Sequence, residues 1–149
     1  VEPQIEGIHP IDDELTAAVR QSGLSQCGTV IDRLVASADA FIDSDMNNCL
    51  TNVRIALETI ARSISYDLSG DELRSKKWGS ALRLLVEVGF LDGQQESVLA
   101  DVYTFISSGA HRTVGLTEAE YVRLGRQLAL SLSYFLIKAY IGSRPAQRL

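Results

Sequence analysis

Hydrophobic positions recur every three or four residues through most of this chain, which is the spacing of amphipathic helices. The most regular run occupies 44–70, where apolar side chains step by three and four without a break. Shorter runs of the same period occupy 11–23, 25–43, 78–90, 91–111 and 116–142. No segment shows the alternation that is typical of strands. The pattern therefore predicts an all-α fold, a bundle of five to six helices joined by short connections.

Residues that stop or start helices divide the chain into three parts. Two prolines and a glycine in 1–10 predict an N-terminal arm without helical period. The helical runs predict a single helical-bundle domain over 11–142, followed by a loose tail over 143–149. Thr117 and Glu120 form a capping-box pattern at the start of the last helix.

The last predicted helix carries apolar side chains on more than one face. One set is Leu128, Leu132, Phe135 and Ala139, and a second set is Leu130, Tyr134, Ile137 and Ile141. Such a helix is either central to the bundle or shared with another subunit. Its apolar segment, Leu128–Ile141, is shorter than the about 20 apolar residues that a membrane span needs, so we expect no membrane contact.

Composition narrows the class of protein. With 149 residues, 46% of them hydrophobic, the chain suits one buried core. Its net charge of −5 argues against a protein coated in phosphate-binding charge, although it leaves room for a local basic patch. Cys27 and Cys49 are far apart and show no metal-ligand spacing, so we expect two small buried thiols, no metal and no cofactor. The N-terminus lacks the pattern of an export signal, which favours a cytoplasmic protein.

Arg54 and Glu58 lie at the edge of the apolar stripe in 44–70, one helical turn apart. They could form an ordinary helix-surface ion pair, which contributes about 0.3 kcal/mol. Alternatively, Glu58 holds Arg54 at the margin of the stripe, and the guanidinium points into a groove where it binds phosphate in bidentate fashion. The residue types and their spacing fit both interpretations.

His111 stands in a turn of small residues between two apolar helices. Gly109 leaves space for a ligand, Ser107 and Ser108 add hydroxyls, and Arg112 adds a fixed positive charge. An imidazole in this setting can act as a general acid or base, or hold an anion. The structural alternative is a helix C-cap, in which Gly109 adopts the left-handed conformation and His111 bonds the last carbonyls.

A basic turn, 74–77, precedes Trp78, the only tryptophan of the chain. A basic turn with an aromatic neighbour can contact RNA, and it can equally be solvated. The helical tyrosines are expected to pack within the bundle while their hydroxyls reach a polar partner.

The order of these motifs resembles the HEPN superfamily, all-α domains common in prokaryotic toxin and phage-defence proteins. The resemblance covers about 46–141 and is greatest to the abortive-infection C-terminal type. It is carried by three stretches in order, "NVRIALETIAR", "ALRLLVEVGFLD" and "LADVYTFISSGAHR", followed by the apolar last helix. The resemblance implies a HEPN-like bundle, a homodimer formed through the late helices, and a role in abortive infection or in a toxin–antitoxin system.

Many HEPN proteins are metal-independent ribonucleases, and that likeness implies His111 as the catalytic acid and base. The family's arginine shortly before this histidine is missing, because Thr104, Phe105, Ile106 and Ser107 occupy those positions. Either Arg54 or Arg112 replaces it, or the domain binds RNA or a nucleotide without cutting. The alternative function is a non-catalytic module for dimerisation, sensing or partner binding. A further domain of a longer chain is another expected partner, since the chain begins with valine.

Overall fold

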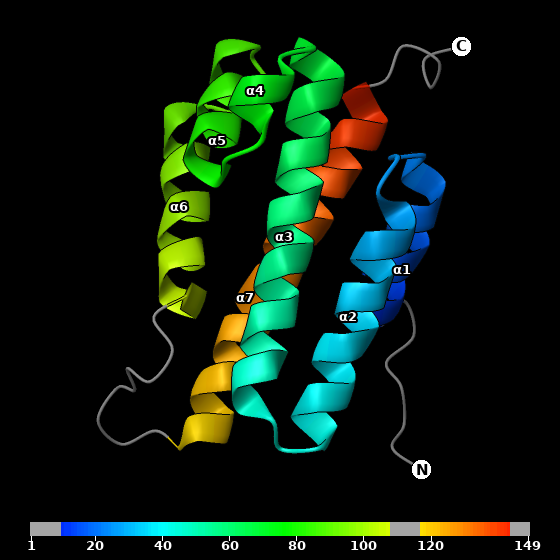
Figure 1. Ribbon diagram of the computed structural model, residues 1–149, viewed down its shortest axis with the longest axis vertical. Helices are drawn as coiled ribbons and strands as arrows, with labels where there is room; N and C mark the ends of the chain where they lie inside the picture. Colours follow the sequence, from blue (N-terminus) through cyan, green and yellow to red (C-terminus); the bar gives the residue numbers. More distant parts are fainter. Residues whose placement is uncertain (1–9, 108–116, 144–149) are drawn as a thin grey trace.

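The computed structural model describes residues 10–107 and 117–143, and every regular element in them is helical (Figure 1). The helices are α1 (Ile11–Ser22), α2 (Cys27–Ile42), α3 (Met46–Ser69), α4 (Glu72–Ser75), α5 (Trp78–Glu87), α6 (Gly93–Ser107) and α7 (Glu118–Ser143). The all-α prediction is confirmed. The described residues hold seven helices where five to six were predicted, and the polar turn before Trp78 contains one that was not predicted, the single-turn helix α4. Asp71 caps it, its carboxylate accepting from the Arg74 N–H at 3.0 Å.

The two longest helices, α3 and α7, lie side by side at the centre and run in the same direction (Figure 1). Helices α1 and α2 pack against one side of this pair, and α4, α5 and α6 against the other. Near the end of the pair, the Tyr140 hydroxyl donates to the Asp67 carboxylate at 2.6 Å. Almost every helix therefore packs against α3, α7 or both.

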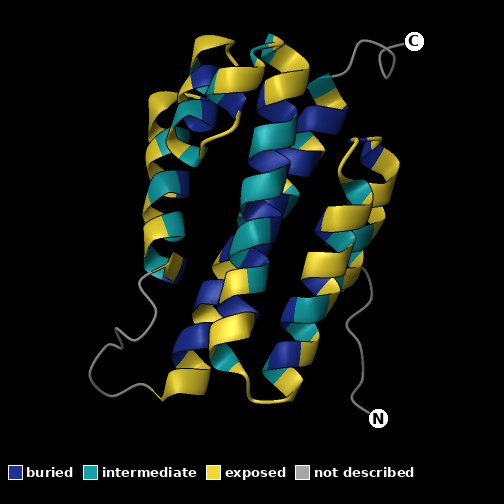
Figure 2. Cartoon of the chain, viewed as in Figure 1, coloured by how far each residue is buried: buried dark blue, intermediate teal, exposed yellow. Residues whose placement is uncertain are grey.

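The core consists of the apolar faces that the helical period predicts (Figure 2). On α3 the predicted stripe is buried except at its end, where Leu68 is exposed. On α7 the two predicted apolar sets differ in burial. Leu130 and Ile137 of the second set are fully buried, whereas Phe135 of the first set is exposed. The helical period of 25–43 and 91–111 also predicts that Val35 and Val98 lie in the core. This is wrong, because both side chains are exposed, Val35 on α2 and Val98 on α6.

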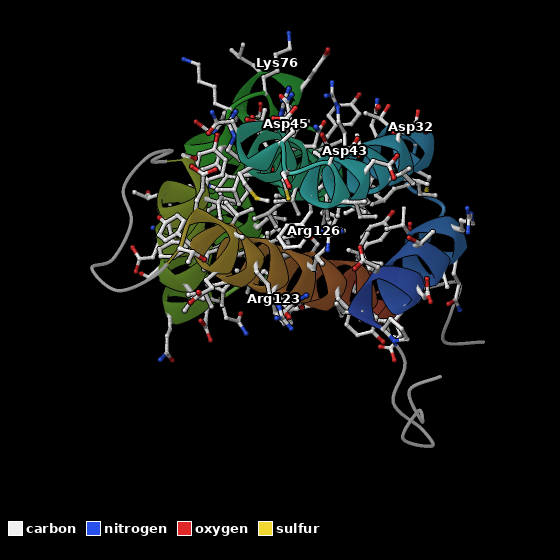
Figure 3. The ribbon with its side chains drawn as sticks, turned by 90° about the horizontal axis from the view of Figure 1, so that it is seen from below. Asp32, Asp43, Asp45, Lys76, Arg123 and Arg126 are labelled. Carbon is white, nitrogen blue, oxygen red and sulfur yellow. The ribbon has the colours of Figure 1, made fainter. Side chains whose placement is uncertain are left out.

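A buried arginine joins the four helices on one side of the bundle (Figure 3). The side chain of Arg126 on α7 is only 10% exposed. Its guanidinium bonds the Asp12 carboxylate on α1 through two N–H groups, at 3.1 and 2.5 Å. Its Nε donates to the Ser37 hydroxyl on α2 at 3.1 Å, and that hydroxyl donates to the Cys49 carbonyl on α3 at 2.8 Å. One polar side chain thus links α1, α2, α3 and α7.

The two cysteines are free thiols, as expected from their separation. Cys49 is fully buried, and this burial raises the pKa of its thiol. Cys27 is half-buried and its thiol donates to the Val19 carbonyl at 3.0 Å. Within the described ranges, no helix combines the length and the apolar character that crossing a membrane requires.

Replacing Arg126 by methionine should lower the free energy of unfolding by about 2 kcal/mol, because the buried hydroxyl of Ser37 loses a donor and Asp12 loses its partner. Asp12→Asn should lower the free energy of unfolding by less, because the side chain at this position is 40% exposed and water can hydrogen-bond to it. Urea unfolding followed by circular dichroism measures both changes. The control is Arg123→Met on the outer side of α7, which should leave the midpoint unchanged; equal midpoints for Arg126→Met and wild type would contradict this account.

Candidate functional site

Arg54 lies half-buried on the side of α3 that faces α6. Its guanidinium carbon stands 5.9 Å from the centre of the Tyr103 ring on α6. A guanidinium over an aromatic face is attracted by the ring quadrupole, which contributes about 1 kcal/mol at a partly desolvated site. Arg54 therefore sits at the contact of two helices, at the margin of the core, which is where the sequence places it.

Glu58 approaches the same tyrosine but does not pair with Arg54. The Tyr103 hydroxyl donates to Glu58 Oε2 at 3.3 Å, and Glu58 Oε1 lies 3.6 Å from the Arg62 guanidinium. No ion pair between Arg54 and Glu58 is found in the described part of the chain. The predicted pairing is wrong because Glu58 turns toward the partners one helical turn farther along α3 and across on α6. The prediction that the Tyr103 hydroxyl reaches a polar partner is confirmed.

The environment of Tyr103 favours its neutral phenol. Burial raises the pKa of Tyr103, and the neighbouring Glu58 carboxylate raises it further, while the Arg54 charge opposes both. The Trp78 ring, at the start of α5, stacks on Tyr103 with centroids 4.5 Å apart and planes at 17°. Trp78 thus packs inward on α6, whereas Arg74 in the basic turn forms a bidentate pair with Glu87 at 2.8 and 3.0 Å.

The last turn of α6 is held against α7. The Tyr121 hydroxyl donates to the Phe105 carbonyl at 3.0 Å, and the two rings stack at 4.7 Å. A Cβ on Gly125 would stand 3.1 Å from Ile106, so the glycine permits this close approach of the helices. The final residue of α6, Ser107, donates from its hydroxyl to the Tyr103 carbonyl at 2.6 Å.

Two of the predicted site residues, Arg54 and Glu58, thus meet at the Tyr103 side chain. A third, Ser107, lies one turn farther along α6 and bonds only the Tyr103 backbone carbonyl. The other four lie outside the described residues: Ser108, Gly109, His111 and Arg112. Sequence reasoning missed Tyr103 and Trp78 as members of the site, because contacts between helices leave no trace in the spacing along one helix. In 10–107 and 117–143, no three His, Cys, Asp or Glu side chains are grouped so that they could hold a metal ion.

Comparisons of the chain with protein-family models, with curated proteins and with solved structures find no match. A half-exposed guanidinium beside aromatic rings suits a phosphate group and a base or sugar next to it. Glu58 and the Tyr103 hydroxyl add a carboxylate acceptor and a weak acid at the same place.

Replacing Tyr103 by phenylalanine keeps the ring on Trp78 and removes the hydroxyl that donates to Glu58. At about pH 8 the variant should be less stable by about 1 kcal/mol. The pKa of Tyr103 is higher in the folded protein than the value of about 10 in the unfolded chain. The extra stability of the wild type is therefore fully present below pH about 10, and it is lost as the pH rises through the pKa of the folded protein.

Urea unfolding of both proteins at roughly pH 8 and pH 10.5 measures this difference. The buried thiol of Cys49 titrates in both proteins and therefore cancels. Tyr66→Phe, at an exposed position of α3, is the matched control and should show no gap at either pH. A gap between wild type and Tyr103→Phe that stays constant with pH would show that the phenol proton is not the cause.

Proposed function

We propose that the chain is a HEPN-type helical domain of a prokaryotic phage-defence or toxin-type protein, acting in the cytoplasm and binding RNA or a nucleotide. The observation that carries this proposal is the meeting of Arg54 and Glu58 with Tyr103, one turn before the end of α6, the helix that precedes His111 in the sequence. Glu58 on α3 and Tyr103 on α6 are neighbours in space although 45 positions separate them in the sequence.

In this proposal the guanidinium of Arg54 takes the place of the arginine that HEPN ribonucleases carry before their histidine. It approaches α6 from α3 and binds a phosphate of the RNA, with Arg112 as a second cation. His111 removes the proton of a ribose 2′-hydroxyl, whose oxygen attacks the adjacent phosphorus. The histidine then returns the proton to the departing 5′-oxygen. No metal ion takes part in these steps.

An RNA cleavage assay in the presence of a chelator tests the nuclease. His111→Ala should reduce the rate by about 100-fold or more, the usual contribution of a general acid and base. Arg54→Gln should reduce both RNA binding and cleavage, whereas Arg83→Gln, which changes an exposed arginine of α5, should alter neither. Equal cleavage by wild type and His111→Ala would contradict the assignment. RNA binding without cleavage would contradict the nuclease activity but would agree with a domain that binds RNA without cutting it.

The second candidate function is a non-catalytic module for dimerisation, favoured by an exposed apolar face. On α7 the side chains of Leu124, Leu128 and Phe135 are exposed in line, and Val98 of α6 is exposed beside them. Leu132 and Phe135 also border a pocket of about 320 Å³ between α6 and α7, which Val98 lines from α6. Contiguous exposed apolar surface of this kind is typical of protein interfaces, and a second copy of the chain is its proposed occupant.

The double variant Leu128→Glu/Phe135→Glu should convert a dimer into a monomer, because charge cannot be buried without a partner. Light scattering after size-exclusion chromatography measures the mass, and circular dichroism checks that the helices remain. Val35→Glu places the same charge on an exposed apolar position of α2 and should leave the dimer intact. A wild-type chain that is monomeric at high concentration would rule out this second function.

A further inference from the structure

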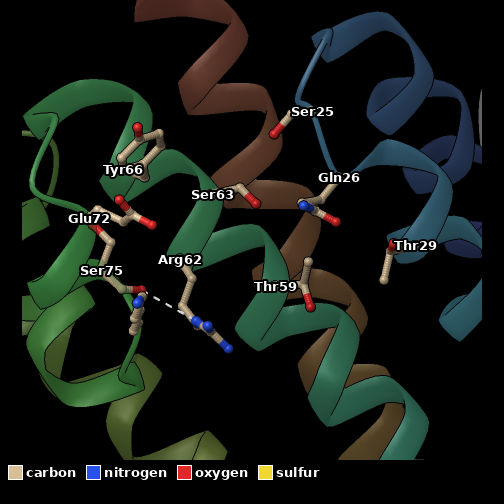
Figure 4. A pocket seen from close by; sticks show the side chains of 10 residues that line it. Ser25, Gln26, Thr29, Thr59, Arg62, Ser63, Tyr66, Glu72 and Ser75 are labelled. Atoms are coloured by element: carbon tan, nitrogen blue, oxygen red, sulfur yellow. Dashed lines mark hydrogen bonds between the residues drawn. The ribbon is translucent and has the colours of Figure 1, made fainter.

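A polar pocket of about 500 Å³ opens beside the second half of α3 (Figure 4). It lies between the start of α2, the second half of α3 and the short helix α4. Its lining residues are Ser25, Gln26, Thr29, Thr59, Arg62, Ser63, Tyr66, Glu72, Ser75 and Lys76. The volume falls within the range of about 300 to 1,000 Å³ that small-molecule sites occupy. None of the residues assigned above to the RNA site lines it.

Two cations give the pocket a place for an anion. Arg62 is held by its Nε, which donates to the Ser75 carbonyl at 3.3 Å, and its side chain remains 40% exposed. This single bond orients the planar guanidinium while its terminal nitrogens stay accessible, with Glu58 3.6 Å from one of them. Lys76 is exposed at the end of α4. A guanidinium fixed at Nε is suited to bind a phosphate through its two outer nitrogens.

The start of α2 adds to this preference. No side chain caps the N-terminus of α2, where Gln26 occupies the cap position. The first N–H groups of a helix have no partner within the helix and carry a partial positive charge. Gln26 and Thr29 both line the pocket, so this end of the helix borders the space that Arg62 faces from α3.

Hydroxyl groups and the Glu72 carboxylate form the remainder of the wall. The carboxylate can only accept hydrogen bonds, so it suits the hydroxyl groups of a ligand and not its phosphate. Thr59, Ser63 and Tyr66 share one face of α3 at spacings of four and three, and Ser25 and Thr29 stand across from them. This face of α3 presents groups that both donate and accept hydrogen bonds. An apolar ligand would leave these groups unsatisfied, whereas a ligand with its own hydroxyls would bond to them.

We propose that this pocket is a second binding site, for a small phosphorylated polyol such as a sugar phosphate. The phosphate binds Arg62 and Lys76 beside the start of α2, and the sugar hydroxyls bond to Thr59, Ser63 and their neighbours. The site goes beyond the proposed RNA function and does not depend on it. The two regions meet at Glu58, which contacts Arg62 on this side and the Tyr103 hydroxyl on the other.

This shared contact supplies a spectroscopic readout. Trp78 is the only tryptophan of the chain and stacks on Tyr103, whose hydroxyl bonds to Glu58. A phosphate that binds Arg62 competes with Glu58 for the guanidinium, and the released carboxylate alters the surroundings of Tyr103. Ligand binding in the pocket should therefore change the fluorescence of Trp78, although no ligand atom touches it.

Titration calorimetry of the full chain with ribose 5-phosphate tests the proposal, with ribose and inorganic phosphate as separate probes. Ribose 5-phosphate should bind and change the Trp78 fluorescence, and it should bind about tenfold more tightly than either probe. Arg62→Gln and Lys76→Gln should each weaken it about tenfold. Both positions are exposed enough that the fold should survive, and circular dichroism checks this.

Arg83→Gln, an exposed arginine outside the pocket, is the matched control and should bind as the wild type does. Arg54→Gln should also keep ribose 5-phosphate binding. The experiment therefore distinguishes a wrong proposal for the RNA site from a wrong proposal for the pocket. The proposal is overturned if ribose 5-phosphate does not bind, or if Arg62→Gln binds it equally well. Equal affinity for inorganic phosphate, or for ribose, would overturn the phosphorylated polyol as the ligand.

Discussion

The buried contact of Arg126 with Asp12 and Ser37 is the constraint on which the arrangement of the helices depends. Apolar faces alone can slide past one another, since burial is non-directional. A buried guanidinium has no such freedom, because an unpaired donor in the interior costs about 1 to 3 kcal/mol or more. With Asp12 on α1, Ser37 on α2 and the Cys49 carbonyl on α3, its bonds select one register for α7 against three other helices.

This register determines which face α3 turns outward. Its apolar stripe is buried in the core, so that its polar residues emerge along the edge that Tyr103 of α6 and the short helix α4 approach. Arg54, Glu58 and Arg62 follow one another by single turns along this emerging edge. The candidate RNA site and the polar pocket are therefore neighbouring parts of one polar edge, held in place by a core on the opposite side of the same helix.

The fold could be predicted largely from the sequence, because helices and their buried faces depend on local spacing. The stripe of α3 from Leu50 to Ile64 is buried as its period predicts. Contacts between distant residues could not be predicted in this way: Asp12 and Arg126 meet across 114 positions. For the site, the marginal position of Arg54 followed from the helical angle. The partner of Glu58 did not, because Tyr103 reaches it from another helix.

The position of Glu58 shows how one carboxylate can connect two binding regions without a change of fold. It divides its two oxygens between the Tyr103 hydroxyl and the Arg62 guanidinium, while Arg54 lies over the tyrosine ring. Two cations and one anion in a row leave a net positive charge, so an anionic ligand is favoured at either end. An anion that binds Arg62 releases Glu58, which can then neutralise part of the charge of Arg54. The attraction of Arg54 for a phosphate of the RNA is lowered as a result. The row therefore predicts that the two regions bind their anions with negative coupling, which is reciprocal by thermodynamic necessity.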